Sequence, residues 1–189
     1  MNGEHGNKNN DYKANLGEFQ VNIDDAIARF QNQHVMERIW KHDHTVWKPD
    51  PTEITNRLGW LHSPETTLNA LDEISEFVKN VKNAGFTNAL LLGMGGSSLA
   101  PEVFRMIFGV KDGFLDLTIL DSTDPGAVLE YKKQFDPEKT LYIVSTKSGG
   151  TVETLSFMKF FYNYVQSALG PENAGKHFVA ITDPGSGLE

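Results

Sequence analysis

The chain contains no cysteine and no long apolar run. The absence of cysteine excludes disulfides, thiolate nucleophiles and cysteine metal sites. No apolar run approaches the roughly 18 residues that a membrane span requires, and the N-terminus lacks the apolar stretch of a secretory signal peptide. We therefore expect a cytoplasmic protein that is neither secreted nor inserted into a membrane.

Positive charge is also scarce, since 17 lysines and arginines face 25 aspartates and glutamates for a formal net charge of −8. This balance argues against a broad nucleic-acid or membrane-binding surface. It does not exclude a small phosphate, because a few N–H groups at a helix N-terminus can hold one locally. We predict a small-molecule ligand, and no nucleic-acid or membrane partner. The 189 residues, 39% of them hydrophobic, suffice for a buried core.

The first half of the chain has the patterns of a tail followed by helices. Residues 1–20 have little apolar content and are predicted to be a disordered tail. Apolar residues then recur at helical spacing from Val21 to about Lys41, and again from Pro64 to a capping glycine at Gly85. The sequence predicts a helical lead-in over 21–85.

A different pattern begins at residue 86. Four short apolar runs, at 89–92, 117–120, 141–144 and 178–181, alternate with helical stretches. Such runs are typical of a parallel sheet that is buried on both faces. We predict an α/β, three-layer, Rossmann-like domain over 86–189. Ligands of such domains bind at the carboxyl edge of the sheet, where polar or glycine-rich loops follow these runs.

The loop after the first run reads GMGGSS at 93–98. Its glycines allow a sharp turn and a close approach to a ligand, and the N–H groups that open the next helix favour an anion. The dinucleotide fingerprint GxGxxG is only partly met, because Ser98 stands where the third glycine would be. The Walker A pattern is absent. A tight turn without a ligand remains the alternative.

The loop after the third run reads TKSGGT at 146–151 and opens another helix. Three hydroxyls, one ammonium and two glycines can together donate to several oxygens of a phosphate monoester. The alternative is that Thr151 is only the N-cap of the helix. Capping needs a single hydroxyl, so the surplus favours a ligand.

These two loops carry a family resemblance. LGMGGSSLAP at 92–101 resembles the GIGGS-x-LGP-type signature of the phosphoglucose isomerase family, and TKSGGTVET at 146–154 resembles its SKTFTT-x-ET phosphate loop. More weakly, residues 46–61 resemble the lead-in of isomerase domains fused behind a transaldolase. The resemblance implies a sugar-isomerase (SIS) domain and the interconversion of glucose 6-phosphate and fructose 6-phosphate, in glycolysis and gluconeogenesis. It implies no cofactor or metal, and a homodimer in the full-length protein.

The resemblance also implies a set of substrate-binding residues. Two glycines in the second loop replace a phenylalanine and a threonine of the family pattern, which brings this version closer to other sugar-isomerase domains. Phosphate binding is therefore predicted more firmly than the identity of the sugar. The implied residues are Gly96 and Ser97 in the first loop, and Thr146, Lys147, Ser148, Gly149, Gly150 and Thr151 in the second.

The family's proton-transfer residues lie in motifs downstream of the matched region. We therefore expect an N-terminal piece of a longer isomerase, inactive by itself and with no catalytic residue assigned. One alternative is a stand-alone SIS-type module that binds or senses a phosphosugar. Another is a dinucleotide-binding oxidoreductase, in which the second loop would have no role. The run His42-Asp43-His44 is interpreted as a solvated helix end rather than a metal site.

Overall fold

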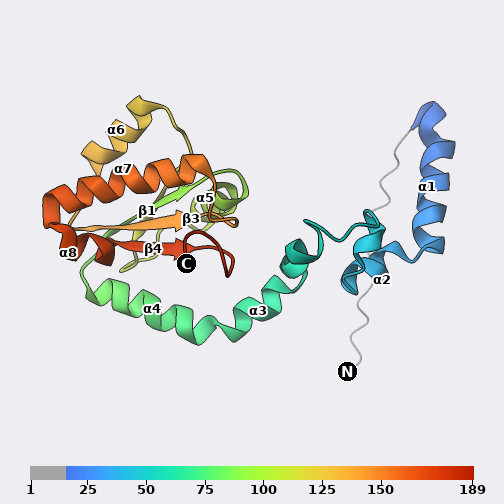
Figure 1. Ribbon diagram of the computed structural model, residues 1–189, viewed down its shortest axis with the longest axis horizontal. Helices are drawn as coiled ribbons and strands as arrows, with labels where there is room; N and C mark the ends of the chain where they lie inside the picture. Colours follow the sequence, from blue (N-terminus) through green and yellow to red (C-terminus); the bar gives the residue numbers. More distant parts are fainter. Residues whose placement is uncertain (1–15) are drawn as a thin grey trace, which may run out of the picture. The chain divides into compact units, whose positions relative to one another are not determined.

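The computed structural model describes residues 16–189, and the chain divides into two compact units, 1–70 and 71–189 (Figure 1). The tail predicted for 1–20 lies mostly outside the described residues. Within it, Gly17–Phe19 form a 3₁₀ turn and α1 begins at Gln20, so helical structure starts before the predicted boundary. The boundary between the two units falls between Ala70 and Leu71 in the sequence, whereas the predicted boundary is at 85/86. The difference arises because the last helix of the predicted lead-in groups with the sheet.

The first unit is a set of short helices with a small core. The prediction of one continuous helix from 21 to about 41 is wrong. The chain leaves the helical conformation at Gln33 and His34, and His34 is left-handed with φ 50°. Among the described residues of this unit, only Val35, Leu58 and Leu61 are buried. Its elements are α1 (Gln20–Asn32), α2 (Val35–Trp40), 3₁₀ segments at His44–Val46 and Thr55–His62, and α3 (Ser63–Asn69).

The histidine-rich run at 42–44 lies at the end of α2. The Asp43 carboxylate accepts hydrogen bonds from Thr45 N at 2.9 Å and from Arg38 Nε at 2.7 Å. The hydroxyl of Thr45 and then the guanidinium of Arg38 lower the pKa of Asp43 to about 2. Asp43 thus caps the next 3₁₀ turn, and residues 16–189 contain no cluster of three or more metal-ligating side chains.

The second unit contains a four-stranded sheet of order β2-β1-β3-β4, in which every neighbouring pair is parallel. The α/β fold and all four predicted strands are therefore confirmed. The strands are β1 (Asn88–Gly93), β2 (Asp116–Leu120), β3 (Thr140–Ser145) and β4 (Phe178–Ile181). The helices are α4 (Leu71–Asn83), α5 (Gly96–Phe108), α6 (Pro125–Gln134), α7 (Val152–Leu169) and α8 (Pro171–Ala174), with a 3₁₀ turn at Gly175–His177.

The two faces of the sheet are covered unequally. Leu90 and Tyr142 belong to an apolar core with α6 and α7, in which Phe161 is completely buried. The opposite face packs against α5 but leaves an apolar recess of about 460 Å³, lined in part by Leu91 and Ile143. Burial on both faces, predicted for the whole sheet, holds for β1 and β3. It is wrong for the edge strand β4, whose Ile181 is 57% exposed.

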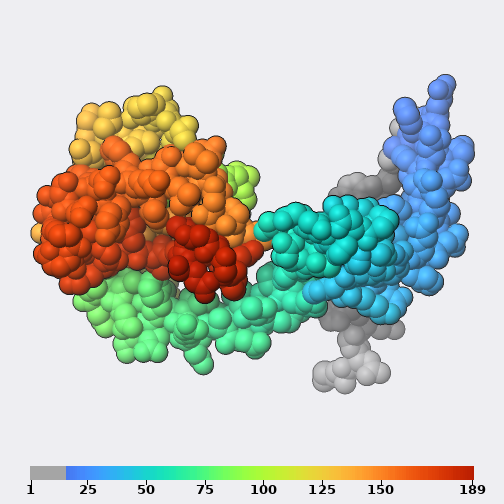
Figure 2. Space-filling model, in the orientation of Figure 1, coloured from blue at the N-terminus to red at the C-terminus, as the bar shows by residue number. Residues whose placement is uncertain are grey.

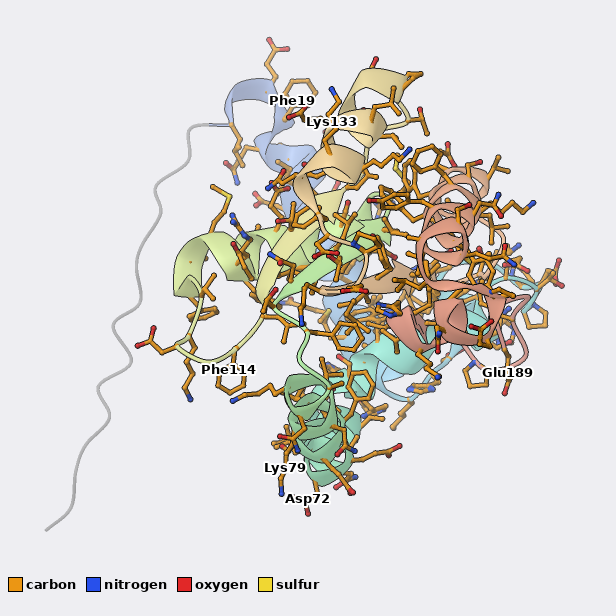
Figure 3. All side chains as sticks on the ribbon, turned by 90° about the vertical axis from the view of Figure 1, so that its left-hand side faces the viewer. Phe19, Asp72, Lys79, Phe114, Lys133 and Glu189 are labelled. Atoms are coloured by element: carbon orange, nitrogen blue, oxygen red, sulfur yellow. The ribbon has the colours of Figure 1, made fainter. Side chains whose placement is uncertain are left out.

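The helix predicted from Pro64 to Gly85 is in fact two helices, α3 and α4, separated at Ala70. Figure 3 shows Asp72 and Lys79 on the outer side of α4, as expected for the polar face of an amphipathic helix. Gly85 follows with φ 85°, as expected for a helix-terminating glycine. Within residues 16–189, no helix is both long and apolar enough to cross a membrane.

Candidate functional site

The sheet topology brings the two glycine-containing loops together. From β1 the chain moves to β2 on one side and later to β3 on the other, so the strand order reverses between β1 and β3. Open α/β sheets bind ligands at such a switch point, beyond the carboxyl ends of the strands. Gly93 at the end of β1 pairs with Ser145 at the end of β3, and a Cβ on Gly93 would lie 3.2 Å from the Ser145 carbonyl oxygen. The loops at 93–98 and 146–151, named here the β1 loop and the β3 loop, therefore begin side by side.

The helices that follow these loops have N-termini without side-chain caps. By contrast, α6, which follows β2, begins with Asp124, whose carboxylate accepts a hydrogen bond from Ala127 N at 2.9 Å. At α5 the N-cap is Gly95, and at α7 it is Thr151, and neither side chain caps its helix. At α5, Ser97 N and Ser98 N donate to the Met94 and Gly95 carbonyls, at 3.2 Å and 3.0 Å. The positive end of a helix dipole attracts anions, as do N–H groups that have no partner. The two uncapped helix ends thus flank the switch point.

Two hydroxyls close the β3 loop. Thr146 Oγ1 and Thr151 Oγ1 lie 2.8 Å apart, and Thr146 is only 3% exposed. The hydroxyl of Thr151 therefore pairs with Thr146 instead of capping α7. In the first turn of α7, Thr154 is fully buried, and its hydroxyl has no hydrogen-bond partner within the described residues. The start of this helix carries more hydroxyl groups than its own hydrogen bonds use.

The middle of the β3 loop faces solvent on one side. Lys147 and Ser148 are exposed, and Ser148 Oγ accepts a hydrogen bond from Gly150 N at 3.2 Å. In the part of the chain that the structure describes, no carboxylate forms an ion pair with the Lys147 ammonium. An exposed ammonium beside an uncapped helix end adds to a locally positive region in an acidic chain.

The β1 loop is open. Gly95 and Gly96 are exposed, and a Cβ at either position would meet no atom within 4 Å. Ser97 is half-buried, whereas Ser98 is fully buried and donates from Oγ to the Gly95 carbonyl at 2.9 Å. The structure thus places all the predicted binding residues in two adjacent loops at one edge of the sheet.

A third segment at this edge had no predicted role. Residues 182–187 follow β4 and lie against the β3 loop, where a Cβ on Gly149 would be 2.7 Å from Gly187 N. Figure 2 shows the last residues of the chain in dark red beside the orange surface that contains this loop. The sequence offered one signal for this segment, the Pro184-Gly185 turn after the fourth strand. Every loop at the carboxyl edge of the sheet is a candidate part of a ligand site.

The parallel sheet, the two helix ends without side-chain caps and the hydroxyl-rich loop at its switch point define an open α/β domain with a candidate ligand site at its carboxyl edge. The chain belongs to the phosphoglucose isomerase family, whose model, described as "Phosphoglucose isomerase", matches residues 64–186. The matched region begins in α3 and contains both loops. The family predicted from the two loop motifs is therefore confirmed.

Relatives and solved structures agree with this assignment. The chain is 32% identical to a glucose-6-phosphate isomerase of Campylobacter jejuni, over 69% of this chain and 32% of the relative. It is 33% identical to one of Thermus thermophilus, over 69% of this chain and 30% of the relative. The chain thus spans about a third of the length of these relatives.

Two solved structures share the fold. One is a hypothetical protein of Thermus thermophilus, with a TM-score of 0.63 and 27% identity, covering 89% of this chain and 38% of that one. The other is a glucose-6-phosphate isomerase of Chlamydia trachomatis, with a TM-score of 0.58 and 28% identity, covering 82% of this chain and 28% of that one. Both support the parallel α/β architecture of the second unit.

Proposed function

We propose that this chain is the sugar-phosphate-binding part of a glucose-6-phosphate isomerase, with the β1 and β3 loops forming the phosphate site. The observation that carries the proposal is the β3 loop. Its hydroxyls at Thr146 and Thr151 pair with each other, while α7 behind them starts without a cap. A phosphate dianion is the ligand that such donors and an adjacent ammonium suit.

In this proposal the chain's residues bind the substrate and do not transfer its protons. Gly96 and Ser97 line one side of the phosphate, and Thr146 to Thr151 line the other. The aldose–ketose conversion, which passes through an enediol, then uses groups outside the third of the relatives that this chain matches. A homodimer of the full-length protein and a cytoplasmic location stay predictions.

Calorimetric titration of the 189-residue chain with glucose 6-phosphate tests the site. Lys147→Ala is expected to weaken binding about tenfold to a hundredfold, because a hydrogen bond to a charged group contributes about 1.5–3 kcal/mol. The matched control is Lys159→Ala, which removes the same charge from an exposed position farther along α7. Equal affinities of the two variants would contradict the assigned site.

Thr151→Val is expected to weaken binding about fivefold, with Thr151→Ser close to the parent, because only valine removes the hydroxyl.

A turnover assay is the second test, and the parent chain is expected to form no fructose 6-phosphate from glucose 6-phosphate. Sustained turnover by the purified chain, scaling with its concentration and lost in Lys147→Ala, would contradict a purely binding role. Tight NAD binding without any response to sugar phosphates would instead support the oxidoreductase alternative.

A further inference from the structure

The 182–187 segment is tied to the backbone of the β3 loop. Past the end of the paired strands, Thr146 N donates to the Ile181 carbonyl at 3.1 Å, and Asp183 N donates to the Lys147 carbonyl at 3.1 Å. Thr182 Oγ1 also lies 3.4 Å from the Lys147 carbonyl oxygen. The carbonyl of Lys147 therefore points at the segment and not at solvent.

The orientation of that carbonyl fixes the orientation of the next amide. In a trans peptide the C=O of one residue and the N–H of the next lie on opposite sides of a rigid plane, and residues 16–189 contain no cis peptide bond. With the Lys147 carbonyl held by the segment, the Ser148 N–H must point the other way. No acceptor for this N–H is present within the described residues. An N–H group without a partner on an exposed loop is a free donor.

A pair of hydroxyls stiffens the segment. Thr182 Oγ1 and Ser186 Oγ are 2.7 Å apart, and Ser186 Oγ also accepts from Leu188 N at 3.2 Å. Thr182 Oγ1 donates to Ser186 Oγ, and its contact with the Lys147 carbonyl oxygen, at 3.4 Å, is the longer of its two contacts. Leu188 in turn packs against the apolar core below α7. The segment is thus anchored at both ends.

The segment also fits against the one buried glycine of the β3 loop. Gly149 has φ 67°, and a Cβ there would lie 2.8 Å from Ser186 Cβ and Oγ and 2.7 Å from Gly187 N. The backbone of Gly187 and the side chain of Ser186 therefore occupy the space in which a side chain at residue 149 would lie. A shift of either one requires the other to move.

We propose that Thr182 and Ser186 are positioning residues that hold the Lys147–Ser148 peptide so that the Ser148 N–H donates to the substrate phosphate. This inference rests on the proposed sugar-phosphate site and adds to it a segment that supports the β3 loop. Neither hydroxyl touches the phosphate. Both act through the carbonyl of Lys147.

The test compares variants of the 189-residue chain in titrations with glucose 6-phosphate and with inorganic phosphate. Thr182→Val is expected to raise both dissociation constants about threefold to tenfold, because it removes one hydrogen bond that orders the loop. Thr182→Ser, which keeps the hydroxyl, is expected to stay within about twofold of the parent. Ser186→Ala should resemble Thr182→Val, and the double variant should lose little more than either, because the hydroxyls act as a unit.

A control and a second measurement separate positioning from loss of structure. Ser167→Ala removes a hydroxyl that bonds only within α7, to the Asn163 carbonyl, and should leave binding unchanged. Amide hydrogen exchange of the ligand-free chain should be faster at Asp183 and Gly149 in Thr182→Val, and unchanged in Thr182→Ser. Unchanged exchange and affinity in Thr182→Val would overturn the inference, as would faster exchange with unchanged affinity.

The two proposals fail in different ways. If the parent chain binds neither glucose 6-phosphate nor inorganic phosphate, the proposed function fails and the positioning role falls with it. If the parent binds and Lys147→Ala weakens binding while Thr182→Val and Ser186→Ala do not, the proposed site stands. In that case only the positioning role is wrong.

Discussion

The β1 and β3 loops both contain a glycine in the left-handed region, but their surroundings differ. Gly95 has φ 55° and is exposed, with no atom within 4 Å of where a Cβ would lie. Gly149 has φ 67° and is buried under the 182–187 segment. Backbone conformation alone explains the glycine in the β1 loop, whereas the β3 loop also needs room for another part of the chain. The β1 loop leaves space for a ligand, whereas the conformation of the β3 loop is held by its contact with residues 182–187.

Gly149→Ala is expected to have the largest effect. The left-handed conformation costs an alanine about 1–2 kcal/mol, and overpacking against Gly187 and Ser186 adds about 1–3 kcal/mol. We expect the free energy of unfolding to fall by about 2–5 kcal/mol in urea titrations. Far-UV circular dichroism is the suitable probe, because Trp40, Trp47 and Trp60 all lie in the first unit. A loss below about 1 kcal/mol would mean that the segment is not packed on this glycine.

Gly95→Ala carries a backbone cost without the crowding, because Gly95 has φ 55° and ψ −120°, a conformation that residues with a Cβ avoid. The expected loss is about 1–3 kcal/mol, measured in the same urea titrations. A larger loss in Gly149→Ala than in Gly95→Ala would show the contribution of the 182–187 segment. If the two losses are equal, the comparison between the loops breaks down, since the contact at Gly149 would then contribute nothing.

The sequence predicted the sheet well because its signal is local. The apolar runs at 89–92, 117–120, 141–144 and 178–181 all became strands, and the glycine-rich loops fell at the predicted edge. The helix breaks were missed because neither His34 nor Ala70 is a residue type that marks a break. Both lie in stretches whose apolar spacing continues on either side.

The contacts that shape the candidate site are of another kind. The loop motif predicts a glycine-rich turn that includes Gly149. It does not predict that Gly187 packs against Gly149, because the two residues are far apart along the chain. Likewise the apolar spacing of α5 predicts burial, yet Phe104 is 59% and Phe108 78% exposed. Apolar periodicity identifies the face that is suited to burial, and only the structure shows what covers it.

Ser98→Ala tests the interior of the β1 loop. The variant removes a buried hydroxyl that donates to the Gly95 carbonyl at 2.9 Å. That carbonyl keeps the bonds from Ser98 N and Leu99 N, so no acceptor is left unsatisfied. A loss of only about 1 kcal/mol is expected in the free energy of unfolding. A loss above about 3 kcal/mol would show that the open loop depends on this contact as strongly as the β3 loop depends on its segment.

Gly96→Ala is expected to have the smallest effect on the fold and to say most about the ligand. Gly96 begins α5 without a positive φ, and a Cβ there would meet nothing within 4 Å. The free energy of unfolding should therefore change by less than about 0.5 kcal/mol, since alanine suits a helix and limits the unfolded chain. Affinity for glucose 6-phosphate should nevertheless fall several-fold if the added methyl group occupies space that the phosphate uses. Unchanged stability with weaker binding would show that this glycine serves the ligand, whereas unchanged binding would remove Gly96 from the proposed site.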